Sequence, residues 1–499
     1  MRWLLLLCLA FVPAPATAQE DPREADMFGA DAAPGAEEKP AVDGKALDSL
    51  DASASDREDA LFGGEYGGKE FGNQEWELLT EDKLQIGGML YLRYGASGYD
   101  GYASEPTAAM PNLLDLYVDG RPNDRVRGFV KGRLSFDPVT TSSLSRMPTS
   151  VADEIMALAE TMKNMPGVPQ EAIDQIDQLT ARPDPTRVML DQFWLKFDIA
   201  RRVYVTVGKQ PLQWGTTRLW NPVDVVNSTR REPLTLFDGR TGVSALKLHI
   251  PIESLAWNII GVVLLEGADS LAELGGAVRL EMALSTMEVG LTGMVRSEVQ
   301  VDGTDMLIPK LGLDWSAGIW ELDFTAEASA SFENETRMGD FTVSDREVLL
   351  QTAGGVSYTH KYSADDFLVV GLEYFFNPDG LSNKEGYVEL FKTPGAFTPF
   401  YLGKHYGACY LALPGPGTWD HTNFTLSNIA NFSDMSFVGR FDYSVSVLTY
   451  LTVQAYAQLH YGEPRGEFRF GLAEGEFFPG SPEIPNQLYS VGINLRIDI

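Results

Sequence analysis

Residues 489–499 alternate between apolar and polar side chains without a break. The odd-numbered positions are apolar: Tyr489, Val491, Ile493, Leu495, Ile497 and Ile499. The even-numbered positions are polar or glycine: Ser490, Gly492, Asn494, Arg496 and Asp498. A period of two is typical of a β-strand with one face in apolar surroundings and the other in water. Because no tail follows to cover an open sheet edge, we expect this strand to pair on both sides in a closed barrel.

Two environments produce this alternation. In a soluble antiparallel sandwich the apolar face packs on a core. In a transmembrane barrel the apolar face meets lipid and the polar face lines a lumen. The last strand fits both, so the choice between them depends on the other segments of the chain.

The first eighteen residues predict export. Arg2 provides a positive charge, residues 4–12 form a short apolar run, and Ala16-Thr17-Ala18 has the small-x-small pattern of a cleavage site. Together they predict a secretory signal peptide over residues 1–18, cut after Ala18. One cysteine then remains, Cys409, so no disulfide forms within the mature chain, and we expect Cys409 to act as a small apolar strand residue.

No later segment has the length of a membrane helix. The longest apolar run, from Leu255 to Leu265, is interrupted by Asn258 and is too short to cross a bilayer. The mean hydropathy is slightly negative, −0.12, which agrees with a barrel in which half of each strand faces water. The remaining candidates are a secreted soluble protein and an outer-membrane barrel.

The formal net charge of −31 is concentrated near the N-terminus. Residues 19–82 hold 19 acidic and 5 basic side chains, a net of −14, among many Ala and Gly residues. Such a composition predicts a mostly disordered periplasmic segment, which offers a docking site for a periplasmic partner. The negative charge makes nucleic acid an unsuitable partner.

The same alternation recurs from Lys83 onward. In one example Gly128, Val130, Gly132, Leu134 and Phe136 oppose Arg127, Lys131, Arg133 and Ser135. We expect about eighteen strands, starting near residues 84, 112, 126, 187, 202, 242, 255, 275, 287, 306, 319, 347, 366, 403, 420, 434, 447 and 487. Treating residues 403–432 as a loop gives sixteen instead. Short turns alternate with longer polar loops, which favours an all-β, transmembrane, antiparallel up-and-down barrel over residues 83–499.

One loop is expected to be helical. In residues 138–186, apolar side chains at helical spacing predict a helix from Ser150 to about Asn164 and a second from Pro169 to Leu179. This hairpin has to bury its apolar stripes. It either enters the mouth of the barrel, caps it from outside, or packs only on itself.

Residues 207–224 contain a recognisable pattern, Val-Gly-Lys-Gln-Pro-Leu-Gln-Trp-Gly followed by Trp-Asn-Pro-Val-Asp. This pattern resembles a signature of porin-like outer-membrane barrels of Gram-negative bacteria, a group that includes uncharacterised families and is reminiscent of alginate-export channels. The resemblance extends over residues 83–499. The chain departs from it at the C-terminus, where such barrels usually end in Phe or Trp and this one ends in Ile499.

The residues that carry the resemblance are expected to form a structural turn rather than to contact substrate directly. Asn221-Pro222 restricts the backbone, and the Asp224 carboxylate can accept backbone hydrogen bonds. The full set is Gly208, Gln210, Trp214, Gly215, Asn221, Pro222 and Asp224.

Catalytic patterns are missing from the sequence. There is no G-x-S-x-G, H-E-x-x-H, P-loop or EF-hand motif, and the five histidines are scattered without ligand spacing. We therefore predict that the protein is not an enzyme and that it uses no cofactor and no metal.

The inward positions of the predicted strands carry charge. Five cations form a predicted basic wall of the lumen: Arg93, Arg127, Lys131, Arg133 and Arg496. Three carboxylates form a predicted acidic wall on a distant strand: Glu321, Asp323 and Glu327. Opposed walls create a transverse field that favours polar or charged solutes. Alternatively, the cations pair with inward neighbours such as Asp115, Asp119 and Asp498 and only fill the lumen.

The function that follows is a porin-like channel in outer-membrane lipid for small hydrophilic or charged solutes. One alternative is an exporter of polysaccharide or lipid that works with a periplasmic complex. Another is a non-conducting barrel whose surface loops bind a partner. A further hypothesis places the acidic segment 19–82 partly in the lumen, against the basic wall.

Overall fold

The computed structural model describes residues 83–139, 147–164, 170, 173, 184–235, 239–266, 268, 274–299, 305–332, 336–338, 341–344, 348–363, 366–392, 397–476 and 480–499. The predicted signal peptide and the acidic segment 19–82 lie outside these residues, as does most of the second predicted helix of the 138–186 loop.

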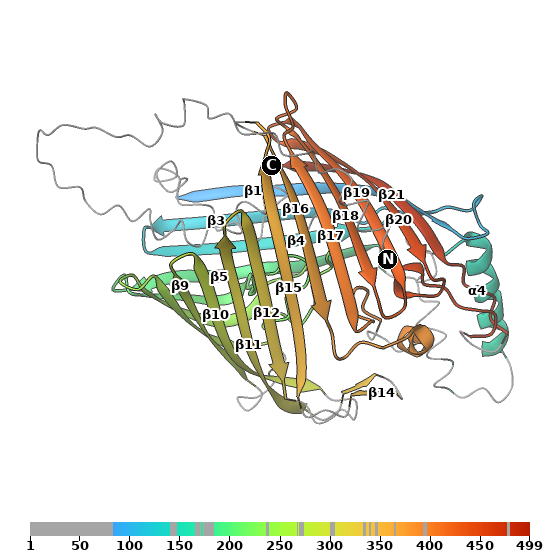
Figure 1. Cartoon of the computed structure of the whole chain (residues 1–499), viewed down its shortest axis with the longest axis horizontal. Helices are drawn as coiled ribbons and strands as arrows, with labels where there is room; N and C mark the ends of the chain where they lie inside the picture. The colour runs from blue at the N-terminus through green and yellow to red at the C-terminus, as the bar shows by residue number, and fades with distance from the viewer. Residues whose placement is uncertain are drawn as a thin grey trace, which may run out of the picture. The chain divides into compact units, whose positions relative to one another are not determined.

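The dominant element is one antiparallel sheet of 19 strands. One of them, β2 (Thr107–Ala109), is a short addition to β1, which leaves 18 strands in the wall. The wall strands are β1 (Leu84–Tyr99), β3 (Asn112–Asn123), β4 (Val126–Phe136), β5 (Thr186–Ile199), β6 (Val203–Gln210), β7 (Val243–Ile252), β8 (Trp257–Leu264), β9 (Gly275–Leu284), β10 (Met287–Val299), β11 (Asp305–Ile319), β12 (Leu322–Ser331), β15 (Leu349–Lys361), β16 (Phe367–Phe376), β17 (His405–Pro414), β18 (Thr422–Asn431), β19 (Ser436–Leu448), β20 (Leu451–Gly462) and β21 (Gln487–Asp498). Each pairs with the wall strand before and after it, as Figure 1 shows.

The last strand closes the barrel. β21 pairs with β20 on one side and with β1 on the other, and Arg496 lies opposite Tyr91 in the β1–β21 register. The predicted closed, all-β, up-and-down barrel is therefore confirmed. Residues 403–432 contain β17 and β18, so the count is eighteen strands and not sixteen.

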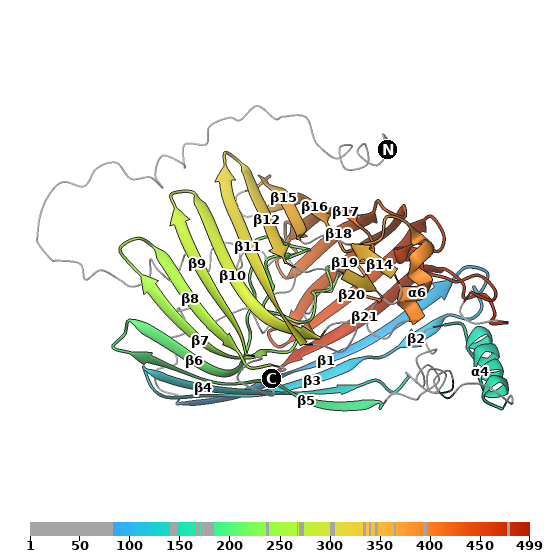
Figure 2. The ribbon, with the colours of Figure 1, turned by 90° about the horizontal axis from the view of Figure 1, so that it is seen from below.

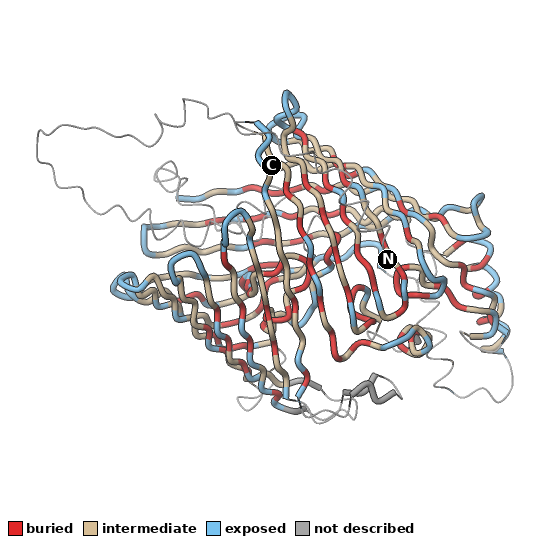
Figure 3. The backbone as a smooth tube through the Cα atoms, in the orientation of Figure 1, coloured by how far each residue is buried: buried red, intermediate tan, exposed pale blue. Residues whose placement is uncertain are grey.

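The wall is apolar outside and polar inside. On β21, Val491 and Ile493 are 42% and 55% exposed, whereas Ser490 and Asn494 on the opposite face are buried. Figure 3 shows buried and more exposed positions alternating along many strands. Rows of exposed large apolar side chains require hydrocarbon rather than water around them, so the outer face is the lipid-facing face. No helix in the described ranges has the length and apolar character needed to cross a membrane.

The two ends of the barrel differ. At one end the strands join through short turns, such as residues 200–202, 285–286 and 320–321. In the first of these, Ala200 and Arg201 both have φ of 55°, the left-handed geometry of a tight hairpin that follows the twist of the strands. At the other end lie the long connections 137–185, 211–242, 377–404 and 463–486. This asymmetry is typical of outer-membrane barrels, whose long loops are external.

Short elements lie in the long connections: α4 (Thr149–Lys163), η4 (Lys384–Gly386), α6 (Tyr387–Lys392) and η5 (Glu467–Arg469). A small hairpin of β13 (Thr336–Met338) and β14 (Phe341–Ser344) lies between β12 and β15. The α4 helix packs Val151 and Ile155 against Leu472 and Ile484 of the β20–β21 connection. It thus buries its apolar stripe on another external loop, and Figure 2 shows α4 and α6 beyond the strands at the same end.

Candidate functional site: the barrel interior

The connection from β6 to β7, residues 211–242, lies inside the barrel. Its backbone contacts Glu327 of β12 and Glu373 of β16, and β16 is seven strands round the wall from β7. The connection therefore crosses the interior. In Figure 2 it is drawn as a green trace that leads from the end of β6 to the start of β7. We call residues 211–242 the interior loop, described here except for 236–238.

Two buried carboxylates clamp the interior loop through its backbone. Glu327 accepts hydrogen bonds from Thr217 N at 2.6 Å and Val223 N at 3.1 Å. Glu373 accepts from Arg218 N at 3.0 Å and Trp220 N at 2.9 Å. Backbone N–H groups of a loop have no ladder partners, so each carboxylate satisfies donors that would otherwise be buried without an acceptor.

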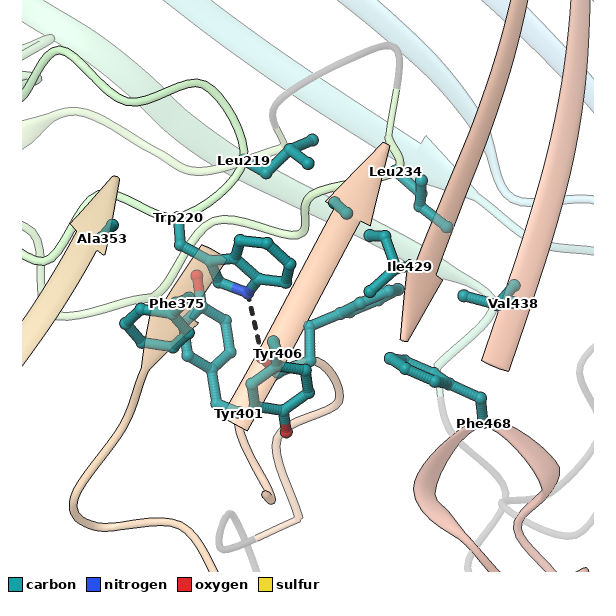
Figure 4. Close-up of a cluster of buried hydrophobic side chains, with 12 residues drawn as sticks. Leu219, Trp220, Leu234, Ala353, Phe375, Tyr401, Tyr406, Ile429, Val438 and Phe468 are labelled. Carbon is teal, nitrogen blue, oxygen red and sulfur yellow. Dashed lines mark hydrogen bonds between the residues drawn. The ribbon is translucent and has the colours of Figure 1, made fainter. Parts of the chain in front are cut away.

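Two apolar clusters complete the attachment. Trp220 is fully buried, stacks on Phe375 of β16 at 5.5 Å between ring centroids, and donates its Nε1–H to Phe400 O at 3.1 Å. Figure 4 shows Trp220 among Phe375, Tyr401 and Tyr406. On the other side Trp214 packs with inward residues of β7 to β10: Val243, Ala245, Val262, Leu264, Ala277 and Met294. The interior loop thus packs its apolar side chains against the wall on two sides of the barrel.

Arginines from the wall tether the remaining part of the loop. Arg133 of β4 donates its Nη1–H to Gly239 O at 2.9 Å, and Arg296 of β10 donates to Val226 O at 2.9 Å. Strands on several sides of the barrel therefore hold one connection. The interior loop is thus attached to β4, β10, β12 and β16.

Steric constraints explain why two positions of the motif, Gly208 and Gly215, are glycine. Gly208 and Gly215 have φ of 119° and 110°, a region that side chains rarely adopt. A Cβ on Gly208 would collide with Phe193 O, and a Cβ on Gly215 would lie against the Glu327 carboxylate. Both positions therefore require glycine for the chain to leave β6 and reach Glu327.

The remaining motif residues lie within the fold of the interior loop. Gln210 is buried at the end of β6 and donates to Ala245 O at 3.0 Å, and Pro222 is buried. Asn221 donates its amide to Thr217 O. Asp224 accepts from Trp214 N at 3.2 Å and forms an ion pair with Arg240 at 2.8 Å. These contacts lie within the loop and its two flanking strands, β6 and β7. The structural role expected of the motif stays a prediction.

The five cations of the predicted basic wall lie on β1, β4 and β21. Four of them form ion pairs: Arg127 with Asp119 at 3.0 Å, Lys131 with Asp191 at 2.5 Å, Arg133 with Asp115 at 2.8 Å and Arg496 with Asp498 at 3.0 Å. The fifth, Arg93, donates to Pro111 O at 2.5 Å and lies over the Tyr91 ring. Four of the five cations of this wall are thus paired with carboxylates in the described residues. The effect of this wall on solutes stays a prediction.

The three carboxylates of the predicted acidic wall are placed differently from one another. Glu321 lies in the exposed turn before β12, Asp323 is exposed near the start of that strand, and Glu327 is buried. Since the Glu327 oxygens accept hydrogen bonds from the interior loop, this carboxylate has a structural task. A role of Glu321 and Asp323 in a transverse field stays a prediction.

Several interior groups were not anticipated from the sequence. Glu373 is the second clamp, and Asp191 completes the ion pairs of β4. Three further arginines lie over tyrosine rings: Arg218 over Tyr410 and Arg440 over Tyr456, both at 4.3 Å, and Arg230 over Tyr401 at 4.8 Å. Arg218 lies two residues before the Trp-Asn-Pro-Val-Asp pattern and Arg230 six residues after it, and this pattern is the one local signal that could have directed attention to them.

Comparisons with known proteins give weak similarities. No family model and no curated protein matches the sequence. The solved structures to which the chain is similar include a BenF-like porin from Pseudomonas fluorescens Pf-5 (TM-score 0.48, 9% identity, 84% of this chain and 99% of that chain). They also include OccAB1 of Acinetobacter baumannii (0.47, 10%, 84% and 97%) and OpdK of Pseudomonas aeruginosa with vanillate (0.46, 7%, 84% and 99%). The barrel itself is established by the pairing of this chain's own strands.

Proposed function

We propose that the protein is a porin-like channel of the Gram-negative outer membrane, through which small hydrophilic or charged solutes diffuse. The observation that carries the proposal is the closed 18-strand wall, lipid-facing outside and charged inside. Barrels of sixteen to eighteen strands are wide enough to enclose an aqueous passage. In this scheme the signal peptide 1–18 directs export.

The interior loop determines which part of the lumen remains for solutes. It packs on β7 to β10 on one side and on β16 to β19 on the other. We infer that solutes pass between the loop and the wall of β20, β21, β1 and β3, because these strands contribute no residue to the two apolar clusters of the loop. Arg230, whose side chain is 41% exposed, belongs to the loop, and Arg93 belongs to the wall.

Conduction distinguishes this function from a barrel that only anchors surface loops. Purified protein in planar bilayers should give stable single-channel currents, and liposomes should swell in small polar solutes but not in large ones. Cys409→Ser is a matched control, because Cys409 lies on the lipid-facing side of β17 and its loss should leave both results unchanged. A folded protein that conducts no ions and admits no solute would support the anchor instead.

A periplasmic partner that docks on residues 19–82 is compatible with this function. It would convert a diffusion channel into part of an export complex. Co-purification of a partner that is lost when residues 19–82 are deleted would favour the exporter.

A further inference from the structure

Two carboxyl groups lie buried together at the external end of the barrel. Asp434 is in the turn between β18 and β19, and Glu467 is in η5 of the β20–β21 connection. Both accept a hydrogen bond from the Asn431 amide, at 3.0 Å and 2.8 Å. Asp434 also accepts from Glu467 N at 2.7 Å. The two acidic side chains therefore share one donor and lie in one small polar site.

The site joins three external segments to the barrel wall: the 377–404 connection, the turn that holds Asp434, and the 463–486 connection. Glu467 accepts from Tyr406 Oη of β17 at 2.7 Å and from Leu402 N of the 377–404 connection at 3.3 Å. Asp434 accepts from Tyr387 Oη of α6 at 2.9 Å. The 377–404 and 463–486 connections are thus held to the ends of β17 and β18 through these two carboxyl groups.

An aromatic cluster lies next to the site. Phe470, three residues after Glu467, packs on Phe391 and Phe397 of the 377–404 connection at 4.9 Å and 4.7 Å. The same residue lies among the groups that pack on α4. Release of Glu467 would therefore loosen a larger external cap than the site alone.

Neither carboxyl group has a basic partner within 4 Å in the part of the chain that the structure describes. Burial raises the pKa of Glu467 to about 7, and the neighbouring Asp434 charge acts in the same direction. Two charged carboxylates in one buried site would repel each other, so the arrangement favours one proton. Among the described residues, Oε1 of Glu467 accepts one hydrogen bond, from Leu402 N at 3.3 Å, whereas Oε2 accepts two shorter ones, from Tyr406 and Asn431.

We propose that Asp434 and Glu467 form a proton-dependent latch. It holds the external 377–404 and 463–486 connections against the ends of β17 and β18 at low pH and releases them as the pH rises. This proposal does not depend on solute conduction. It concerns the external loops, whatever passes through the barrel.

The direction follows from linkage. In the latched state Glu467 keeps its proton up to about pH 7, whereas a released, solvated glutamate loses its proton near its usual pKa of about 4.3. Between these values the latched state binds more protons than the released state. The equilibrium constant that favours the latched state therefore falls about tenfold for each unit by which the pH rises. Above about pH 7 Glu467 is ionised in both states, and the equilibrium constant no longer changes with pH.

Other titratable or charged groups face the site. They are Tyr387 of α6, Tyr406 of β17, Arg469 of η5 and His460 of β20. Burial beside Asp434 raises the pKa of Tyr387, so it stays neutral over the range of interest. His460 binds Phe468 O through Nδ1 at 2.6 Å and is the group whose titration has to be separated from that of Glu467.

Hydrogen exchange of the full-length protein in lipid nanodiscs tests the latch. Protection of peptides covering 397–404 and 463–472, corrected for the intrinsic exchange rate, should fall about tenfold per pH unit between roughly pH 5 and pH 7 and level off above it. Glu467→Gln, which mimics the protonated acid, should remove this slope. Glu474→Gln, an exposed acid on the same connection, should retain it.

Each other outcome overturns the proposal. Protection that is independent of pH in the unaltered protein would exclude a proton-dependent latch, and so would a slope that survives in Glu467→Gln. Loss of the slope in His460→Gln with its retention in Glu467→Gln would assign the effect to histidine. If Glu467→Gln fails to fold, Tyr406→Phe removes a donor that stabilises the ionised acid and should move the transition to higher pH; an unmoved transition contradicts the latch.

Discussion

The Glu373 carboxylate of β16 accepts the backbone N–H of Trp220 at 2.9 Å, although the two residues lie 153 positions apart in the chain. The contact links β16 to a loop whose nearer flanking strand, β7, lies seven strands away round the wall. Together with Glu327 and the Trp220 cluster, it makes the interior loop part of the folded core rather than an appendage of β6 and β7.

Removing this carboxylate should loosen the loop. Glu373→Ala leaves the N–H groups of Arg218, Leu219 and Trp220 without their acceptor. Buried unsatisfied donors of this kind cost about 1–3 kcal/mol each, and with partial access of water we expect a loss of about 2–4 kcal/mol in unfolding free energy. Single-channel currents should become noisier, because the loop samples more positions.

Glu373→Gln is the matched variant for this prediction. Its amide oxygen keeps part of the acceptor function, so its loss of stability should be smaller than that of alanine. Equal stability of all three proteins in denaturant titration would show that the clamp contributes nothing measurable.

The apolar attachment of the loop can be tested separately. Trp220→Ala opens a cavity among Phe375, Tyr401 and Tyr406. Large-to-small changes of buried aromatic residues cost about 3–5 kcal/mol. Limited proteolysis should therefore cut within residues 218–235 in the variant and not in the unaltered protein. Resistance of both proteins to cleavage would mean that the loop stays docked without the indole.

The strand pattern was largely predictable from the sequence. The expected starts of the eighteen strands lie within four residues of the observed ones, because each strand has its lipid-facing row marked by local alternation. The shift is largest at β20, expected near 447 and starting at Leu451, since β19 continues to Leu448.

The interior was much less predictable. The contacts of Glu327 and Glu373 with the interior loop span 104 to 155 positions, and no local pattern reports such separations. Alternation identified Arg127, Lys131 and Arg133 as inward residues, but the row alone does not specify their partners. Asp191 joins that cluster where a register shift interrupts the pairing of β4 and β5.

Charge selectivity should depend on interior cations that are exposed and only weakly paired. Arg230 has its nearest carboxylate, that of Asp379, at 3.9 Å and is 41% exposed. A unit charge about 6 Å from a passing ion in water is worth roughly 0.7 kcal/mol. Arg230→Gln should therefore lower anion permeability and raise cation permeability by roughly threefold each, so that the anion-to-cation permeability ratio falls roughly tenfold. The measurement is the shift in reversal potential across a salt gradient.

The paired cations provide the control. Replacing both members of the Arg496–Asp498 pair, as Arg496→Gln with Asp498→Asn, leaves the interior charge unchanged and should leave the reversal potential unchanged. A larger shift from this double variant than from Arg230→Gln would mean that position in the lumen, rather than net charge, decides selectivity.

The closing strand allows a test of which face meets lipid. Ile493 lies near the middle of β21, points outward and is 55% exposed. A lysine on the lipid face near the bilayer centre costs about 2–4 kcal/mol, whereas a lysine facing the lumen can stay hydrated. Ile493→Lys should therefore fold poorly into liposomes, as judged by the heat-modifiable mobility of the folded barrel in gels. Ser444→Lys, on the inward face of β19, should fold nearly as well as the unaltered protein. Equal folding of the two lysine variants would contradict the lipid-facing assignment, because the two faces of the wall would then be equally wet.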